Sequence, residues 1–295
     1  MITATLGGLI KDYRIKKRLS QFDVSLRIGW KDTSRLSKIE QGRVGKPTRE
    51  TIEKIIKALG LNEQEKGQLL YAGSYVPTDE EIESIIKKVK TKIDNWHYPA
   101  YLMDFSWRQL YTNNITIDLF KLQQDWKKIE RKSKPNVLEA PFLPKNILKI
   151  TLQKGEDEVN LKPFTIAHIA TFKTVNHRFQ HELWYKKLIQ SLMKYKEFRR
   201  LWPIVGPDYE KSLEYEYKEI TGIYDGRKRT FKLHMFVIGI INDPRFDLIF
   251  YTPADRDTDE YCQKLMTKAK KENAIQGKSA AENLNSQQDH KSFNG

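Results

Sequence analysis

Hydrophobic residues recur every three or four positions through the first 75 residues of the chain. This spacing predicts amphipathic helices that each bury one apolar face. Five helices fit the segment: they cover residues 6–17, two short stretches within 20–42, and residues 48–59 and 62–71. The segment 1–75 is therefore predicted to fold as a helical domain with its own core.

The two short helices within residues 20–42 are predicted to be joined by a tight turn. Ser20 is expected to cap the first helix and Asp32 the second, because their side-chain oxygens accept hydrogen bonds from free amide groups. Gly29 suits the left-handed backbone of the turn, and Gly42 is expected to end the second helix. The residues of the first helix that we expect to face inward are Phe22, Leu26 and Val24.

The second of these helices has two unlike faces. At about 100° per residue, Leu36 and Ile39 fall together on an apolar face. The opposite face carries short polar and basic side chains, namely Thr33, Ser34, Ser37, Lys38 and Gln41. A helix that is apolar behind and covered with hydrogen-bond donors in front suits the DNA major groove.

A longer helix is predicted over residues 78–93. Thr78 and Glu81 have the spacing of a capping box, which marks the start of the helix. Its apolar stripe consists of Ile82, Ile85, Ile86, Val89 and Ile93. Such a stripe must be buried, either against the following domain or against the same stripe of a second copy. We expect the following domain to cover it, which makes residues 76–95 a connector.

From Trp96 onward the pattern changes to short strands mixed with helices. The predicted strands cover residues 98–106, 107–113, 212–220, 230–238 and 246–253, and the predicted helices 114–120, 164–178, 181–194 and 197–202. The sequences DGRK at 225–228 and NDPR at 242–245 predict hairpin turns. An α+β domain is therefore expected over residues 96–266. Residues 267–295 are polar and predicted to be disordered.

Positive charge is concentrated near the N-terminus. The whole chain has a formal net charge of +14, and residues 1–75 carry 15 Lys and Arg against 8 Asp and Glu. A basic module is expected of a protein that binds phosphate groups.

Cys262 is the single cysteine, so an intrachain disulfide is excluded and a reducing compartment is expected. The longest apolar run, residues 235–241, is far shorter than the ~20 residues of a membrane span. We therefore expect a cytoplasmic protein without membrane contact.

The N-terminal segment resembles the Cro and phage-repressor type of helix-turn-helix domain found in the XRE family of transcriptional regulators. The resemblance rests on RIKKRLSQ at 14–21, SRLSKIEQGR at 34–43 and KPTRETIEKIIKALGL at 46–61. It implies a five-helix lambda-repressor-like DNA-binding domain. It also implies a buried ion pair between Arg14 and Glu40, which joins the first helix to the end of the recognition helix.

The same resemblance implies contacts to DNA. Gln21 would hold a phosphate, Thr33, Ser34 and Lys38 would face base edges, and Arg43 and Lys46 would touch the DNA backbone. The complete set of predicted DNA-binding residues is Gln21, Thr33, Ser34, Arg35, Ser37, Lys38, Arg43 and Lys46, with Arg14, Glu40, Gly29 and Gly42 as structural residues. Trp30 and Lys31 make the turn one residue longer than is common in the family. We therefore expect the recognition helix to be slightly rotated or shifted.

Residues 95–255 resemble the ligand-binding domain that follows the helix-turn-helix in MmyB-like regulators. The resemblance rests on WHYPAYLMDFSWRQLYTNN at 96–114, YKEFRRLW at 195–202 and FDLIFYTP at 246–253. It implies a PAS-like fold, in which helices pack on an antiparallel sheet, and a small, fatty-acid-like ligand. The chain lacks the His-Pro-x-x-Gly stretch of the family, so the identity of the ligand is not carried over.

Four residues of this second domain are candidate ligand contacts. Asn113 ends an apolar strand, where its side chain would either orient a ligand or cap a helix. Arg199 would either meet a ligand carboxylate or lie on a solvated helix face. The aromatic residues Trp107 and Tyr111 belong either to a pocket or to the core.

The sequence carries no readable catalytic motif, and His177 and His181 have metal-ligand spacing without a recognisable third ligand. We therefore expect no enzyme activity, no metal and no cofactor.

The predicted function is that of a homodimeric, sequence-specific transcriptional regulator that binds double-stranded DNA. Its C-terminal domain is expected to sense a small hydrophobic molecule. Two alternatives remain open: a helix-turn-helix that acts through protein–protein contacts, as in antitoxins, or a cryptic enzyme in the C-terminal domain.

Overall fold

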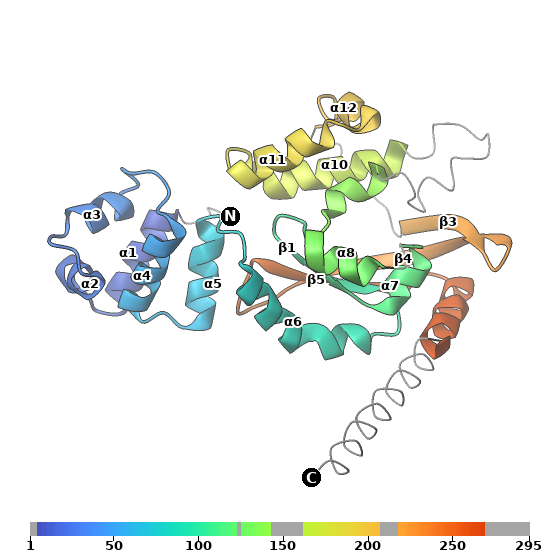
Figure 1. The fold of residues 1–295 in the computed structure, drawn as a ribbon, viewed down its shortest axis with the longest axis horizontal. Coiled ribbons are helices and arrows are strands. Elements are labelled where there is room, and N and C mark those ends of the chain that lie inside the picture. The colour runs from blue at the N-terminus through green and yellow to red at the C-terminus, as the bar shows by residue number, and fades with distance from the viewer. Residues whose placement is uncertain (1–4, 123–124, 143–161, 207–217, 269–295) are drawn as a thin grey trace, which may run out of the picture.

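The computed structural model describes residues 5–122, 125–142, 162–206 and 218–268. Five helices form a first domain, and an antiparallel sheet with helices packed against it forms a second (Figure 1). The helices of the first domain are α1 (Leu6–Lys16), α2 (Gln21–Ile28), α3 (Ser34–Glu40), α4 (Arg49–Leu59) and α5 (Glu63–Ala72). They enclose one hydrophobic core, as the sequence pattern predicted, and residues from all five contribute to it.

The start of α2 and the C-terminal ends of α2 and α3 follow the predicted capping chemistry. Ser20 Oγ accepts from the Asp23 amide at 3.0 Å, and Asp23 Oδ2 accepts from the Ser20 amide at 2.7 Å, which completes a capping box. Gly29 ends α2 with a φ of 84°, and Gly42 follows α3 with a φ of 66°. Both values lie in the left-handed region, which only glycine adopts without strain.

The inward face of α2 differs from the prediction. Phe22 and Leu26 are 60% and 64% exposed, whereas Val24 and Ser25 are buried. Two apolar stripes run along this helix in the sequence, one through Phe22 and Leu26 and one through Val24 and Ile28. The second stripe is the one that packs against the core, with Val24 fully buried in it and Ile28 partly buried beside it. The prediction for Phe22 and Leu26 was therefore wrong.

The second domain is built on a five-stranded antiparallel sheet with the order β2-β1-β5-β4-β3. Its strands are β1 (Ala100–Asp104), β2 (Gln109–Thr112), β3 (Lys218–Tyr224), β4 (Arg227–Gly239) and β5 (Phe246–Pro253). Side chains alternate between the two faces of the sheet. Leu102 and Leu248 point to one hydrophobic cluster, whereas Tyr101 and Ile249 point to another.

Helix α6 (Asp79–Asp94) covers the first of these faces (Figure 1). Its buried residues pack with Leu102, Leu110 and Phe246 of the sheet. The apolar stripe of the connector is thus buried against the following domain, as expected, and not against a second copy. The capping box of Thr78 and Glu81 is also present.

The remaining helices surround the other face and the edge of the sheet. They are α7 (Asn114–Leu119), α8 (Trp126–Ser133), η1 (Val137–Phe142), α10 (Lys162–Asn176), η2 (His177–Phe179), α11 (Leu183–Leu192), α12 (Lys196–Leu201) and a last helix at 256–268. The predicted strand at 212–220 is described only from Lys218, and it continues to Tyr224. It runs further than predicted because the turn contains only Asp225 and Gly226, both with positive φ. The predicted tail beyond residue 268 lies outside the described residues.

A buried charge network joins the two domains. The Arg245 guanidinium, only 1% exposed, contacts Glu81 at 3.0 Å and Asp243 at 2.7 Å. Arg49 of α4 reaches the same Glu81 at 2.7 Å. Burial alone would raise the pKa of Glu81, but its hydrogen bonds to Arg245 and the Thr78 amide, with both positive charges, lower the pKa to about 2. Residues distant in the sequence therefore fix the orientation of the first domain on the second.

Among the described residues, no helix has both the length and the apolar character needed to cross a lipid bilayer.

Candidate nucleic-acid interface

Helix α3 presents the polar face that the sequence predicts. Leu36 and Ile39 are buried in the core, and Ser34 and Lys38 are exposed on the outer side. At the start of the helix, Asp32 Oδ1 accepts from the Ser34 amide at 2.8 Å. The N-cap position itself is taken by Thr33, whose side chain makes no capping hydrogen bond, so Asp32 acts from one residue before the cap and is not the N-cap that the sequence predicted. The hydrogen bond from the Ser34 amide lowers the pKa of Asp32.

The other polar side chains of this face are less exposed or are held by hydrogen bonds within the helix. Thr33 and Ser37 are half-buried, and the Gln41 amide donates to Ser37 Oγ at 3.0 Å. These contacts leave Ser34 and Lys38 as the predicted base contacts that project furthest into solvent.

The lengthened turn between α2 and α3 is filled by Trp30. Its half-buried ring packs against the domain core, and its amide donates to Ser25 O at 2.9 Å. The Arg35 guanidinium lies 4.8 Å from the Trp30 ring centre and donates to Thr51 Oγ1 at 3.4 Å. Arg35 thus holds the turn against α4. Lys31, which the sequence named as part of this longer turn but not among the DNA-binding residues, is exposed there.

An ion pair fixes α3 against α1. Arg14 donates to the two carboxylate oxygens of Glu40 at 2.6 and 3.0 Å, and the Glu40 side chain is 2% exposed. Arg14 also donates to Leu19 O at 3.0 Å. The Gln21 amide donates to the same carboxylate at 2.8 Å. The implied ion pair is therefore present, and it also orients Gln21, whose contact with a phosphate stays a prediction.

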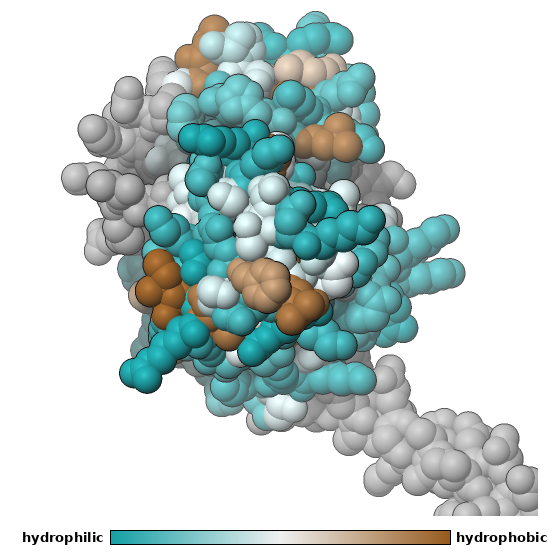
Figure 2. Space-filling model, turned by 90° about the vertical axis from the view of Figure 1, so that its left-hand side faces the viewer, coloured by the Kyte–Doolittle hydropathy of each residue, from teal (hydrophilic) through white to brown (hydrophobic). Residues whose placement is uncertain are grey.

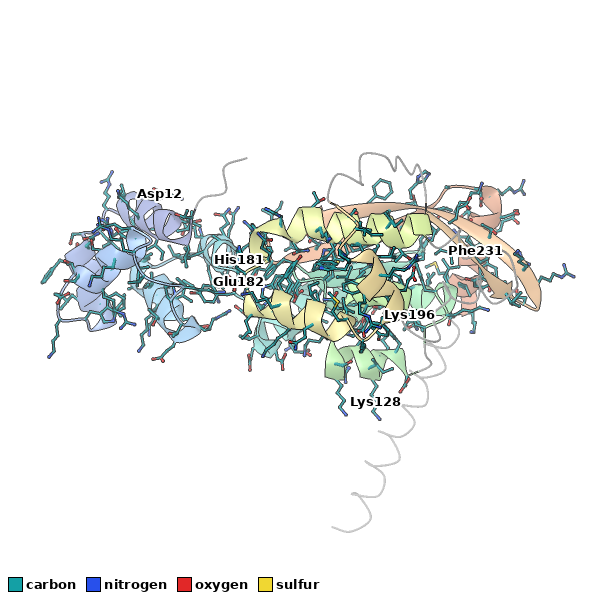
Figure 3. All side chains as sticks on the ribbon, turned by 90° about the horizontal axis from the view of Figure 1, so that it is seen from above. Asp12, Lys128, His181, Glu182, Lys196 and Phe231 are labelled. Carbon is teal, nitrogen blue, oxygen red and sulfur yellow. The ribbon has the colours of Figure 1, made fainter. Side chains whose placement is uncertain are left out.

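The two cations predicted to follow the recognition helix lie in different surroundings. Arg43 is exposed directly after α3. Lys46 instead points toward the second domain, where its ammonium contacts Glu182 at 2.9 Å and Ser74 O at 3.1 Å. Figure 3 shows Glu182 at the end of α11 nearest the first domain. Lys46 is thus engaged between the domains and is placed less favourably than Arg43 for a DNA contact.

The end of the molecule formed by the first domain is mostly hydrophilic (Figure 2). Some apolar side chains stand among the polar ones in this view. Phe22 and Leu26 are the largest exposed apolar side chains on α2. A polar and basic surface of this kind suits a polyanion, and the two apolar side chains suit a protein contact.

The structure does not bring the four candidate ligand contacts together. Asn113 is buried, and it caps α7 by accepting from the Thr116 amide at 2.9 Å. Its amide nitrogen donates to Tyr98 O at 2.8 Å, and Ala100 also donates to its oxygen, at 3.2 Å. Every polar atom of Asn113 is therefore used by the protein itself. Of the two roles weighed for this residue, the helix cap is the one observed.

The other three candidates lie apart from one another. The Tyr111 hydroxyl donates to Asp94 at the end of α6, and burial raises the pKa of Tyr111 to about 12. The Trp107 ring packs 5.2 Å from Phe172, in the cluster on the opposite face of the sheet. Arg199 is exposed on α12. These residues serve packing and surface roles and do not line one common cavity.

Comparison with known proteins agrees with the geometry of the first domain. No curated protein matches the chain. A family model described as a helix-turn-helix domain matches residues 5–69, which contain α1 to α4 and most of α5. Residues 5–69 of this chain therefore form a helix-turn-helix domain.

Proposed function

We propose that this protein is a sequence-specific DNA-binding transcriptional regulator of the XRE type. The observation that carries the proposal is the exposed polar face of α3, which the Arg14–Glu40 ion pair holds rigidly on the domain. Lys38 and Ser34 are placed to read bases, and Arg43 is placed to neutralise a phosphate. The protein acts by binding and not by catalysis.

We further propose that two copies bind one operator. A helix-turn-helix that reads a two-fold site needs two recognition helices about one turn of DNA apart. The stretch Met235–Ile238 of β4 supports self-association, because all four of its apolar side chains are about half exposed. Ile241, which follows β4, is 79% exposed and extends this apolar strip. A second copy would cover the strip.

The C-terminal domain is proposed to be the sensor of this regulator, with the PAS-like character that its resemblance implies. Its antiparallel sheet with packed helices agrees with that expectation. Ligand binding alters DNA affinity only if the ligand prefers one arrangement of the domains over another. The contacts of Arg245 and Lys46 between the domains supply an arrangement that a ligand can stabilise or disrupt.

Two substitutions test the DNA-binding surface, measured with a DNA fragment upstream of the protein's own gene over a range of salt concentrations. Lys38→Ala should relax the preference for one base pair, at a cost of about 1–3 kcal/mol. Arg43→Ala should weaken binding to all sequences alike and reduce the slope of log K against log salt by about 1. Lys88→Ala removes one exposed charge from α6 and serves as the matched control.

The result that would contradict the proposal is an affinity that neither Lys38→Ala nor Arg43→Ala changes relative to Lys88→Ala. Native mass spectrometry of the same complex should find two protein chains per duplex.

The exposed Phe22 and Leu26 favour the rival function, in which the helix-turn-helix binds a protein partner. That rival predicts a salt-insensitive protein complex that Phe22→Ser disrupts, without any DNA binding.

A further inference from the structure

A carboxylate without a partner lies where the β4–β5 hairpin meets the first domain. Asp247 of β5 is half-buried, and within the described part of the chain neither a hydrogen-bond donor nor a cation contacts its oxygens. Met103 and Ile249, its neighbours on the same face of the sheet, are buried and apolar. Burial and the negative charge of Asp104 raise the pKa of Asp247 to about 6. Ionisation is therefore unfavourable here, and a cation beside the carboxylate would favour it.

A hollow of about 470 Å³ opens beside this carboxylate. Its walls come from α5 of the first domain and from the β4–β5 hairpin of the second, which lie side by side (Figure 1). Gln68 and Tyr71 line it from α5, and Ile240, Pro244 and Asp247 line it from the hairpin. We call this site the hairpin hollow. Its volume is that of an ordinary small-molecule site, and interfaces between domains are common places for such sites.

A glycine keeps the carboxylate open to the hollow. Gly239 of β4 lies directly opposite Asp247 in the ladder, so a side chain there would point to the same face of the sheet. A Cβ on Gly239 would lie 3.6 Å from Asp247 Oδ1, and Gly239 itself lines the hollow. Glycine in a strand often marks a place where another group approaches closely. The missing side chain thus leaves room for a group in contact with the carboxylate.

The charged groups around the hollow are engaged elsewhere, so its carboxylate is left for a cation from outside. Asp104 contacts Arg108 at 2.6 Å, and the buried Arg245 contacts two other carboxylates. On the α5 side, the Arg178 guanidinium lies 4.1 Å from the centre of the Tyr71 ring. Arg178 thus stacks on an aromatic ring and forms no ion pair with the carboxylate of the hollow.

We infer that the hairpin hollow binds a small organic ammonium ion, whose nitrogen donates to the Asp247 carboxylate and whose apolar body packs on Ile240 and Pro244. Such a ligand is opposite in charge to the fatty-acid-like ligand that the family resemblance implies. It would also contact α5 through Tyr71 and so favour the observed arrangement of the two domains. The inference goes beyond the proposed DNA-binding function and does not depend on it.

The test uses three probes with one benzyl group, namely phenethylamine, 2-phenylethanol and phenylacetate, titrated into the full-length protein at pH 7.5 by calorimetry. Phenethylamine should bind about tenfold more tightly than the alcohol, because a hydrogen bond between two ionised groups is stronger than one with a neutral donor. Phenylacetate should not bind, because Asp247 repels its charge. Equal affinities for the amine and the alcohol, or binding of the carboxylate, would overturn the inference.

Variants locate the site. Asp247→Asn keeps the shape of the side chain but removes its charge, and it should weaken phenethylamine about tenfold without changing the affinity for the alcohol. Asp257→Asn removes an exposed carboxylate elsewhere and is the matched control. An amine affinity that is the same in Asp247→Asn and Asp257→Asn would show that the amine does not bind at this carboxylate.

A second pair of variants fills the hollow and keeps the carboxylate. Gly239→Val places a branched side chain beside Asp247, so the amine and the alcohol should both lose binding. Gly239→Ala, whose Cβ makes only an ordinary contact, should weaken both probes less and keeps the test decisive if the valine variant does not fold. Full amine affinity in Gly239→Ala and in a folded Gly239→Val would place the amine outside the hollow.

Two further measurements decide the class of ligand and its contact with both domains. Nα-acetyl-lysine amide presents the ammonium group of a protein side chain without an aromatic body, and it should bind more weakly than phenethylamine. Tighter binding of this lysine probe would overturn the assignment to a small amine. Saturating phenethylamine should slow amide hydrogen exchange in both α5 and the β4–β5 hairpin. Protection of the hairpin alone would show that the ligand does not bridge the domains.

Discussion

Charged residues are used in opposite ways at the two ends of the helix-turn-helix domain. Around α3, Lys38 and Arg43 are exposed to solvent. At the junction with the second domain, Arg245 is buried and contacts two carboxylates. Exposed cations are screened by salt and attract a polyanion from solution, whereas a buried, hydrogen-bonded pair mainly fixes geometry.

This difference assigns a separate task to each region. The α3 end is built for a reversible, salt-dependent contact with another molecule. The junction keeps that surface in one orientation on the second domain, and the capping carboxylate Glu81 shares in it by accepting from both Arg49 and Arg245. A change at the junction should therefore affect stability first, whereas a change on α3 should affect only binding.

The largest expected effect comes from removing the buried guanidinium of the junction. Arg245→Met keeps much of the side-chain volume but leaves Asp243 without its cation and Glu81 with Arg49 alone. We expect the free energy of unfolding to fall by about 3–5 kcal/mol, because breaking a buried pair strands its partner. Urea unfolding at neutral pH measures this change.

Arg256→Met is the matched control, since Arg256 is 89% exposed and its pair with Glu260 lies on the surface. Such a pair contributes about 0–1 kcal/mol. Equal midpoints for the two variants would show that the junction network does not hold the domains together.

A smaller effect is expected from two glycines that allow close backbone approach. A Cβ on Gly67 would lie 2.7 Å from Asn242 O, where α5 meets the β4–β5 hairpin. A Cβ on Gly7 would lie 2.4 Å from Ile39 O, where α1 meets the end of α3. Both contacts involve backbone atoms, so each Gly→Ala change should cost about 1–3 kcal/mol. Gly67→Ala should act at the junction and Gly7→Ala within the helix-turn-helix domain.

Gly8→Ala is the control for this pair, because its Cβ would meet only the Thr5 side chain, at 3.0 Å. Thermal unfolding should give a Tm at or above that of the unchanged protein for Gly8→Ala, since alanine favours the helix. If Gly67→Ala matched Gly8→Ala, the close packing of the two domains would be refuted.

The helix-turn-helix domain could be predicted from sequence almost to the residue. Its helices are amphipathic, and local signals such as Ser20, Gly29 and Gly42 mark their ends. These signals act over three or four residues, so a sequence alone contains them. The inward face of α2 was missed because Phe22 and Leu26 form a second apolar stripe, and only packing decides between two stripes.

The strands of the second domain could be predicted from the sequence, but the side chains that come together in the folded domain could not. β5 occurs at the predicted bounds, and β1 and β2 lie within the predicted strands. The junction network joins Arg49, Glu81 and Arg245, which no local pattern relates. A hollow lined by Trp126 of α8 and Trp184 of α11 depends likewise on the way in which distant helices pack. Side chains that meet only through tertiary structure leave no periodic signal in the sequence.

The smallest effect that separates the two regions concerns Asp247, a carboxylate at the junction that pairs with no cation within the described part of the chain. Asp247 lies on β5 beside the hollow that Tyr71 and Pro244 line at the α5 side of the hairpin. Burial and the negative charge of the nearby Asp104 raise its pKa from 3.8 to about 6. Because the folded protein binds this proton more tightly than the unfolded chain does, ionisation of Asp247 costs stability above about pH 6. That cost disappears as the pH falls below the pKa of the unfolded chain, near 4.

Asp247→Asn should therefore raise the free energy of unfolding by roughly 1–2 kcal/mol at pH 7.5 and by almost nothing near pH 3.5. Chemical unfolding at both pH values measures the difference, and the exposed Asp257→Asn is its control. The sign of this stability change separates the two kinds of charge: the paired charges of the junction stabilise the folded protein, whereas the ionised Asp247 opposes folding at neutral pH. A loss of stability in Asp247→Asn at pH 7.5 would mean instead that this carboxylate has a stabilising partner when ionised, as Glu81 does.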